Sequence, residues 1–249
     1  MTHFVLVHGA YQGGWIWHET AARLRAAGHT VFTPTLDGCA ERAGARRPGI
    51  TTESHGQEVA SLLFYEDLND VVLVGTSSGG MVMAAAAERA RDRIGRLVFV
   101  DALALMPGEC IRDVVTRPAS IENDLALGPS PEDAAGRLFA ELPGEVQSWA
   151  AARTTLHPAA CFRSPEQLDT FWSSPWDAHV IYSAREPNPG DTHQRRSAEA
   201  LNARFSVLDA YHSPLLSAPA GLHDLIVAST TDTPRSGAQT LRLKYRTTS

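Results

Sequence analysis

Short apolar runs rich in valine, leucine and phenylalanine alternate with longer stretches of helical periodicity along much of the chain. The runs that we interpret as buried strands are residues 4–7, 31–34, 71–74, 97–100, 180–182 and 206–208. The helical stretches are residues 17–27, 54–63, 81–91, 195–201 and 222–227. Strands that alternate with helices build a parallel sheet covered on both faces, so the pattern predicts an α/β fold with about six strands.

This alternation stops after Asp101 and resumes near residue 177. The intervening segment is punctuated by prolines and carries short helical patterns at residues 131–142, 145–152 and 165–172. We therefore predict a core of residues 1–105 and 177–228 and a helical cap of residues 106–176, inserted after the fourth strand. Residues 229–249 are rich in threonine, serine and arginine, and we interpret them as a polar tail without a core role.

Composition narrows the class of protein. The 249 residues are 43% hydrophobic and 20% charged, and the net charge of −6 gives no general attraction to nucleic acid or to an anionic membrane. No apolar run has membrane-spanning length, and no signal-peptide pattern precedes the first strand. The cysteines, Cys39, Cys110 and Cys161, are scattered and odd in number, which favours a reducing compartment and a cytoplasmic location.

The strongest local motif is Gly75-Thr76-Ser77-Ser78-Gly79. An apolar run ends at this motif and an alanine-rich helical pattern follows it, which is the strand, sharp turn and helix of a nucleophile elbow. A β-carbon at Gly75 or Gly79 would collide with a neighbouring strand or helix. The context predicts that Ser77 is a catalytic nucleophile.

A second glycine-containing loop follows the first predicted strand, as His8-Gly9-Ala10 and then Gly13-Gly14. In sites of the nucleophile-elbow type, one oxyanion amide comes from such a loop and the other from the residue after the nucleophile. We therefore predict an oxyanion hole formed by the backbone N–H groups of Ala10 and Ser78.

A serine nucleophile needs a base and an orienting carboxylate, in the chain order serine, acid, histidine. His212 follows the last predicted strand of the core and is the predicted base. Glu186 follows the strand that ends at Tyr182 and is the acid favoured by position. Asp101, which ends an earlier strand, is the main alternative, and Asp191 is a third.

Motifs for metals and cofactors are missing from the sequence. It contains no His-Glu-x-x-His, no Cys-x-x-Cys and no G-x-G-x-x-G spacing, so we predict no metal and no cofactor. Lys244, the only lysine, lies in the polar tail and is not expected to be catalytic.

Several stretches together resemble the plant methylesterase and hydroxynitrile lyase branch of the α/β-hydrolases, and also bacterial pyrethroid-hydrolase-like carboxylesterases. They are residues 3–10 (HFVLVHGA), 14–17 (GWIW), 24–31, 98–102 (VFVDA), the nucleophile elbow, the His212 loop and, in the cap, residues 153–158 (RTTLHP). The resemblance implies the α/β-hydrolase fold, Ser77, His212, an acid at position 186, and Ala10 and Ser78 as oxyanion donors.

The sequence departs from this branch at several positions. Glutamate stands at position 186 where aspartate is usual, and Thr76 stands before the nucleophile where esterases often have histidine. The lyases of the branch carry threonine at the position of Gly9 and lysine directly after the catalytic histidine, where this chain has Ser213. The resemblance therefore implies ester cleavage rather than cyanohydrin cleavage.

These observations predict a serine hydrolase that cleaves a small, largely apolar carboxylic ester, lactone or thioester through an acyl-enzyme. The expected partner is a small-molecule substrate, with no nucleic acid and no membrane, and the sequence does not indicate an oligomeric state. Two alternatives stay open. One is a lyase or other non-hydrolytic reaction on the same Ser-His-acid scaffold, and the other is a ligand-binding protein with residual esterase activity.

Overall fold

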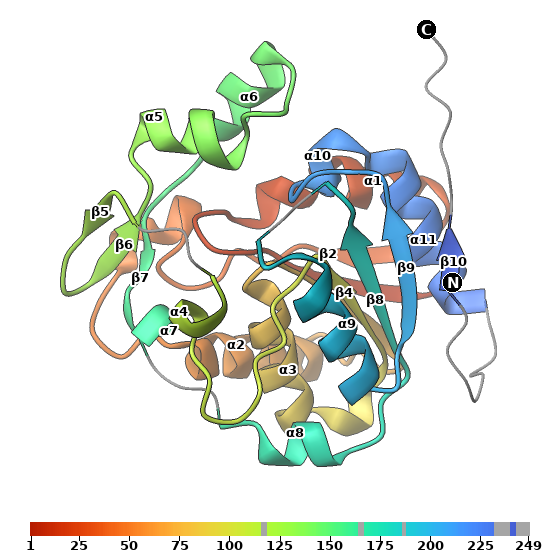
Figure 1. The fold of residues 1–249 in the computed structure, drawn as a ribbon. Coiled ribbons are helices and arrows are strands. Elements are labelled where there is room, and N and C mark those ends of the chain that lie inside the picture. Colours follow the sequence, from red (N-terminus) through yellow and green to blue (C-terminus); the bar gives the residue numbers. More distant parts are fainter. Residues whose placement is uncertain (116–118, 164–166, 186–187, 232–239, 243–249) are drawn as a thin grey trace, which may run out of the picture.

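A seven-stranded parallel sheet forms the centre of the molecule (Figure 1). The computed structural model describes residues 1–115, 119–163, 167–185, 188–231 and 240–242. The strand order is β10-β9-β8-β4-β3-β1-β2. The strands are β1 (His3–Val7), β2 (Thr30–Phe32), β3 (Val71–Thr76), β4 (Ile94–Val100), β8 (Ala178–Ser183), β9 (Arg204–Leu208) and β10 (Thr240–Arg242).

The α/β architecture with a parallel sheet that the sequence predicts is confirmed, and the six predicted strands are all present. The seventh, β10, lies within the segment for which we predicted no core role, and it pairs in parallel with β9. That short strand has no periodic pattern of its own, because three residues are too few to show an alternation.

Helices cover both faces of the sheet (Figure 1). Side chains of β1 alternate between two apolar clusters, since Val5 and Val7 pack on one face while Phe4 and Leu6 pack on the other. The first face is covered by α2 (Thr52–Tyr65), α3 (Gly79–Arg89) and α9 (Gly190–Ala200). The second is covered by α1 (His18–Ala26) and α11 (Pro219–Thr231). Shorter pieces are η1 (Gly14–Trp17), η2 (Ala40–Ala45), η3 (Arg91–Arg93) and α10 (Pro214–Ser217).

The segment between β4 and β8 contains a second, small sheet as well as short helices (Figure 1). Its antiparallel strands have the order β5-β6-β7 and are β5 (Ile121–Glu122), β6 (Ala126–Gly128) and β7 (His157–Pro158). The helices are α4 (Ile111–Val114), α5 (Pro131–Asp133), the π-helix η4 (Ala134–Leu138), α6 (Gly144–Ala151), α7 (Ala160–Arg163) and α8 (Asp169–Ser173). The sequence predicted only helices here, and strands of two or three residues are too short to leave a pattern.

Within the described part of the chain, no helix combines the length and the apolar character needed to cross a membrane.

Candidate active site

Ser77 lies on a strained turn between β3 and α3. Its φ is +50°, in the left-handed region that residues other than glycine seldom adopt. A β-carbon on Gly75 would lie 2.7 Å from the carbonyl oxygen of Gly79, and one on Gly79 would lie 2.6 Å from the carbonyl oxygens of Val7 and His8. The two glycines therefore allow the turn to close against both α3 and β1, and the turn raises the serine side chain above the sheet.

Three side chains form a continuous chain of hydrogen bonds at the carboxyl end of the sheet. His212 Nε2 lies 3.1 Å from Ser77 Oγ, and His212 Nδ1 lies 2.6 Å from Asp101 Oδ2. Ser77 follows β3, Asp101 follows β4, and His212 lies in the loop after β9. The sheet order thus brings together residues that are 135 positions apart in the sequence. This geometry suits a nucleophile, a base and an orienting acid.

The acid in contact with His212 is Asp101, the main alternative to Glu186 in the sequence-based prediction. Glu186, the favoured acid, lies outside the described residues. Asp191 is on α9, where its carboxylate pairs with Arg195 at 2.7 Å on the surface. Asp101 follows β4, which lies in the sheet between β8 and β3, the strand that precedes Ser77.

Asp101 is held on both oxygens. The backbone N–H of Ser183 donates to Oδ1 at 3.2 Å, while His212 occupies Oδ2. The Asp101 side chain is 0% exposed and that of His212 is 17% exposed. A buried carboxylate that accepts two hydrogen bonds fixes the ring of the histidine and its tautomer, with the proton on Nδ1 and the lone pair of Nε2 toward the serine.

The predicted oxyanion donors belong to the same site. Ala10 and Ser78 both line a cavity that also contains Ser77 and His212. The loop of Ala10 is fixed by His8, whose Nδ1 donates to Gly9 O at 2.8 Å and whose Nε2 accepts from Leu36 N at 3.0 Å. Burial lowers the pKa of His8 to about 4, so this imidazole is neutral near pH 7. It therefore donates one hydrogen bond and accepts the other, and both hold the loop in place.

The cavity above Ser77 has a volume of about 380 Å³. Much of its wall comes from the segment between β4 and β8, which contributes apolar residues and two arginine–carboxylate pairs. These lining residues are Ile111, Val115, Leu127, Leu138 and Phe162, with Arg112–Glu122 and Arg137–Asp133 as the charged pairs. A space of this size and composition suits a small and mainly apolar ligand.

Tyr11 is a wall residue that the sequence analysis did not identify. Its ring stacks on Phe162 with centroids 5.8 Å apart, and both residues line the cavity. The larger aromatic residues described in the segment between β4 and β8, by contrast, do not line it. Trp149 packs on Trp15, and Trp172 and Trp176 pack on the buried Phe171. No local pattern separates these two groups of aromatic residues, because the difference arises from the way the segment folds over the sheet.

One group among the described residues has the composition and spacing of a metal-binding site. It consists of His55, His157 and Cys161, which are all buried and lie apart from Ser77 and His212. Burial lowers the pKa of both histidines, that of His157 well below its ordinary value of 6.5. Both imidazoles are therefore neutral near pH 7.

The chain matches the alpha/beta hydrolase family over residues 4–225, and it belongs to that family. The methylesterase and hydroxynitrile lyase branch named by the sequence resemblance is also confirmed, because a methyl jasmonate esterase and a hydroxynitrile lyase are among the curated relatives. A pyrethroid hydrolase from Sphingobium faniae shares the fold, with a TM-score of 0.76 at 20% identity.

Two curated relatives and one solved structure illustrate the likeness. The carbendazim hydrolyzing esterase of Nocardioides sp. (strain SG-4G) is 45% identical over 111 residues, which cover 45% of this chain and 46% of that protein. Methyl jasmonate esterase 1 of Vitis vinifera is 30% identical over 188 residues, 67% of this chain and 70% of that protein. An extracellular alpha/beta-hydrolase from a Paenibacillus species has a TM-score of 0.81 at 24% identity, with 93% of this chain and 100% of that chain covered.

The aligned segments span about half the length of several of the curated relatives, 46% to 48% for the carbendazim esterase and two methylesterases of Arabidopsis thaliana.

Proposed function

We propose that this protein is a serine esterase that cleaves a small, largely apolar carboxylic ester. The observation that carries the proposal is the chain of hydrogen bonds from Ser77 through His212 to Asp101, at the floor of a cavity of about 380 Å³. The names of the relatives support it, because they include methylesterases and a methyl jasmonate esterase. A methyl or other short alkyl ester is therefore the substrate class that we expect.

In the proposed reaction, Ser77 Oγ attacks the carbonyl carbon of the ester while His212 Nε2 takes its proton. The N–H groups of Ala10 and Ser78 stabilise the negative charge on the carbonyl oxygen. His212 then gives the proton to the departing alkoxide, which leaves an acyl group on Ser77. Water, deprotonated by the same histidine, attacks this acyl-enzyme and releases the acid.

Asp101 has the role of the orienting acid in this proposal. Its carboxylate accepts the Nδ1 proton of His212 and stabilises the imidazolium that forms during each attack. We also propose that residues 106–176 form a cap that selects the substrate, since apolar residues of this segment line the cavity. A cytoplasmic location is supported by the scattered positions and odd number of the cysteines, Cys39, Cys110 and Cys161.

A fluorophosphonate probe tests the nucleophile, because it reacts with an activated serine. Wild-type protein should be labelled at Ser77, and Ser77→Ala should not be labelled. The same substitution should lower the rate of p-nitrophenyl acetate cleavage by at least ~10⁴-fold. Ser61→Ala is the matched control, since Ser61 lies on α2 and hydrogen bonds only locally with Gln57. Labelling that persists in Ser77→Ala would show that the nucleophile is another residue.

A burst experiment distinguishes an enzyme from a binding protein. Rapid release of about one p-nitrophenol per chain, followed by a steady rate, is expected when an acyl-enzyme forms faster than it is hydrolysed. A protein that only binds ligands gives neither the burst nor the steady rate.

A further inference from the structure

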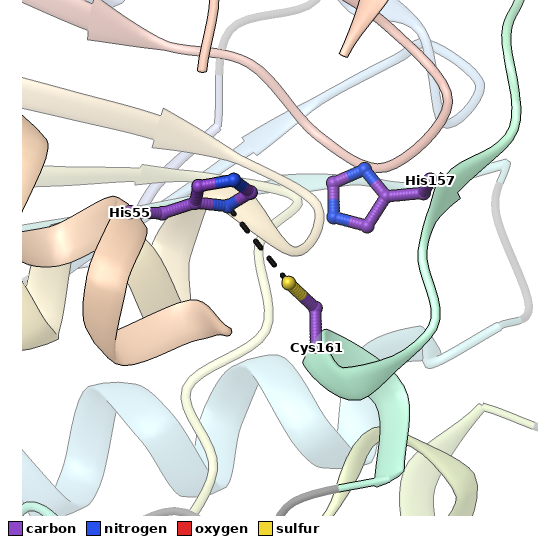
Figure 2. A group of neighbouring side chains, drawn as sticks. All are labelled: His55, His157 and Cys161. Atoms are coloured by element: carbon purple, nitrogen blue, oxygen red, sulfur yellow. Dashed lines mark hydrogen bonds between the residues drawn. The ribbon is translucent and has the colours of Figure 1, made fainter. Parts of the chain in front are cut away.

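A buried cluster of one cysteine and two histidines lies outside the catalytic machinery. His55 belongs to α2, His157 to β7 and Cys161 to α7, and their side chains point toward one another (Figure 2). One nitrogen from each histidine and the sulfur atom lie within 4.8 Å of one another. The three residues are 0%, 4% and 3% exposed, respectively. Thiolate and imidazole are the ligands that zinc prefers.

The surroundings orient both imidazole rings for binding a metal. His55 Nε2 donates to the carbonyl oxygen of Asp37 at 2.8 Å, which leaves Nδ1 facing Cys161 at 3.9 Å. His157 Nδ1 contacts Cys39 Sγ at 3.4 Å, and its other ring nitrogen faces the cluster (Figure 2). Metal-bound histidines characteristically donate their second N–H to a carbonyl or another acceptor, which fixes the tautomer.

The contacts of Cys39 agree with this arrangement. Its thiol lies 3.7 Å from the carbonyl oxygen of Asp37, in position to donate, so its sulfur can accept the Nδ1 proton of His157. Both imidazole lone pairs then converge on Cys161. The Cys161 sulfur also lies 3.8 Å from the carbonyl oxygen of Ile50, so its single thiol proton has this oxygen and the two nitrogens as neighbouring acceptors.

We propose that His55, His157 and Cys161 bind a zinc ion, with a water molecule as the fourth ligand of the tetrahedron. Bond lengths of about 2.3 Å to sulfur and about 2.0 Å to nitrogen place the sulfur and a nitrogen about 3.5 Å apart in a tetrahedral site. The separation of 3.9 Å between Cys161 Sγ and His55 Nδ1 is close to that value. When zinc binds, the Cys161 S–H bond breaks, a zinc–sulfur bond forms, and one proton is released to solvent.

The proposed ion joins parts of the chain that are far apart in sequence. α2 is a core helix, while β7 and α7 belong to the segment between β4 and β8. Phe162, which follows Cys161, lines the catalytic cavity and stacks on Tyr11. Zinc would therefore fasten this segment to the core beside the cavity wall, which is a structural role separate from the chemistry at Ser77.

The first test measures the metal directly. Because the cluster is buried, the full-length protein should be expressed in zinc-supplemented medium, so that the ion is incorporated during folding, and then dialysed against a weak chelator. Elemental analysis should find about one zinc per chain. X-ray absorption at the zinc edge should show one sulfur at about 2.3 Å and three nitrogen or oxygen ligands at about 2.0 Å, two of them imidazoles.

Cobalt substitution identifies the ligands. Protein produced in cobalt-supplemented minimal medium should show the intense visible bands of tetrahedral cobalt and a thiolate-to-cobalt charge-transfer band in the near ultraviolet. Cys161→Ser should lose the charge-transfer band, and His55→Ala should lose the metal. Cys110→Ser is the matched control, because Cys110 is a thiol at the start of α4, outside the cluster, and it should retain both the band and one metal per chain.

Stability provides a readout that requires no variant. Removal of zinc with a strong chelator should lower Tm by about 5–10 °C, since a ligand held at about 100 times its Kd stabilises by about 2.7 kcal/mol. The proposal is overturned if folded wild-type protein holds no zinc after expression in supplemented medium. It is also overturned if the ion is lost on dialysis against the weak chelator, or if Cys161→Ser folds and keeps the charge-transfer band. Loss of ester cleavage in Ser77→Ala with zinc retained would separate this proposal from the proposed function.

Discussion

Asp101→Asn is the substitution that most directly tests the arrangement of the catalytic site. The carboxylate accepts hydrogen bonds on both oxygens, from Ser183 N at 3.2 Å and from His212 Nδ1 at 2.6 Å. An asparagine has only one oxygen. If that oxygen stays with Ser183, the amide N–H₂ points at His212 and forces the ring into the tautomer with a proton on Nε2, which then cannot accept the proton of Ser77.

The opposite orientation of the amide is also unfavourable. The oxygen would then accept from His212, but the N–H₂ group would face the N–H of Ser183, so two donors would meet in a site that is 0% exposed. Such a mismatch costs about 1–3 kcal/mol of stability. In either orientation the negative charge that stabilises the imidazolium is lost. We expect kcat/KM to fall by about 10³–10⁴-fold, which is about 4–5.5 kcal/mol of transition-state stabilisation.

The assay is kcat/KM for p-nitrophenyl acetate, measured together with Tm and circular dichroism to establish that each variant is folded. Asp191→Asn is the matched control, because it makes the same chemical change in a surface carboxylate that pairs with Arg195, and it should change kcat/KM by less than about threefold. Glu186→Gln should lower kcat/KM by less than about tenfold. A loss in Glu186→Gln that equals or exceeds the loss in Asp101→Asn would refute the assignment of Asp101 as the orienting acid.

Four further predictions concern the nucleophile elbow, the buried His179, the cavity wall and the type of reaction. Gly79→Ala should unfold the protein or abolish its activity, because the new β-carbon would lie 2.6 Å from two carbonyl oxygens. Gly44→Ala is the control and should be tolerated in the same activity and thermal unfolding assays, because its β-carbon would have no atom within 4 Å. Burial lowers the pKa of His179 from 6.5 to about 3, so the unfolded chain takes up this proton first as the pH falls. The free energy of unfolding, measured with urea, should then fall by about 2 kcal/mol between pH 7 and pH 5 in the wild type, and this fall should be absent in His179→Gln. Leu138→Phe should narrow the cavity and change the ratio of kcat/KM between butanoate and acetate esters, and a selectivity change seen only with a lowered Tm would contradict the role of the cap. No enzyme-dependent cyanide should be released from mandelonitrile, because Ser213, which follows His212, has no positive charge to stabilise a departing cyanide. Release above the buffer rate would favour the lyase alternative.

Local sequence patterns were sufficient to predict the strand, turn and helix that position Ser77. An apolar run, a glycine-flanked serine and an alanine-rich helix are neighbours in the sequence, so their meaning depends on neighbouring residues alone. The six strands and the covering helices were predicted for the same reason. The small sheet of β5, β6 and β7 and the pairing of β10 were missed, because elements of two or three residues show no periodicity.

The amino-acid sequence by itself determined the fold class, the serine at the elbow and the histidine after β9. The tertiary structure alone decided which carboxylate contacts that histidine, because the contact between Asp101 and His212 depends on the order of strands in the sheet. The cluster of His55, His157 and Cys161 is a second case, since its members are up to 106 positions apart and match no metal-binding motif. Spacing along the chain encodes contacts within an element or a turn, whereas contacts between distant residues exist only once the sheet and the segment above it have packed together.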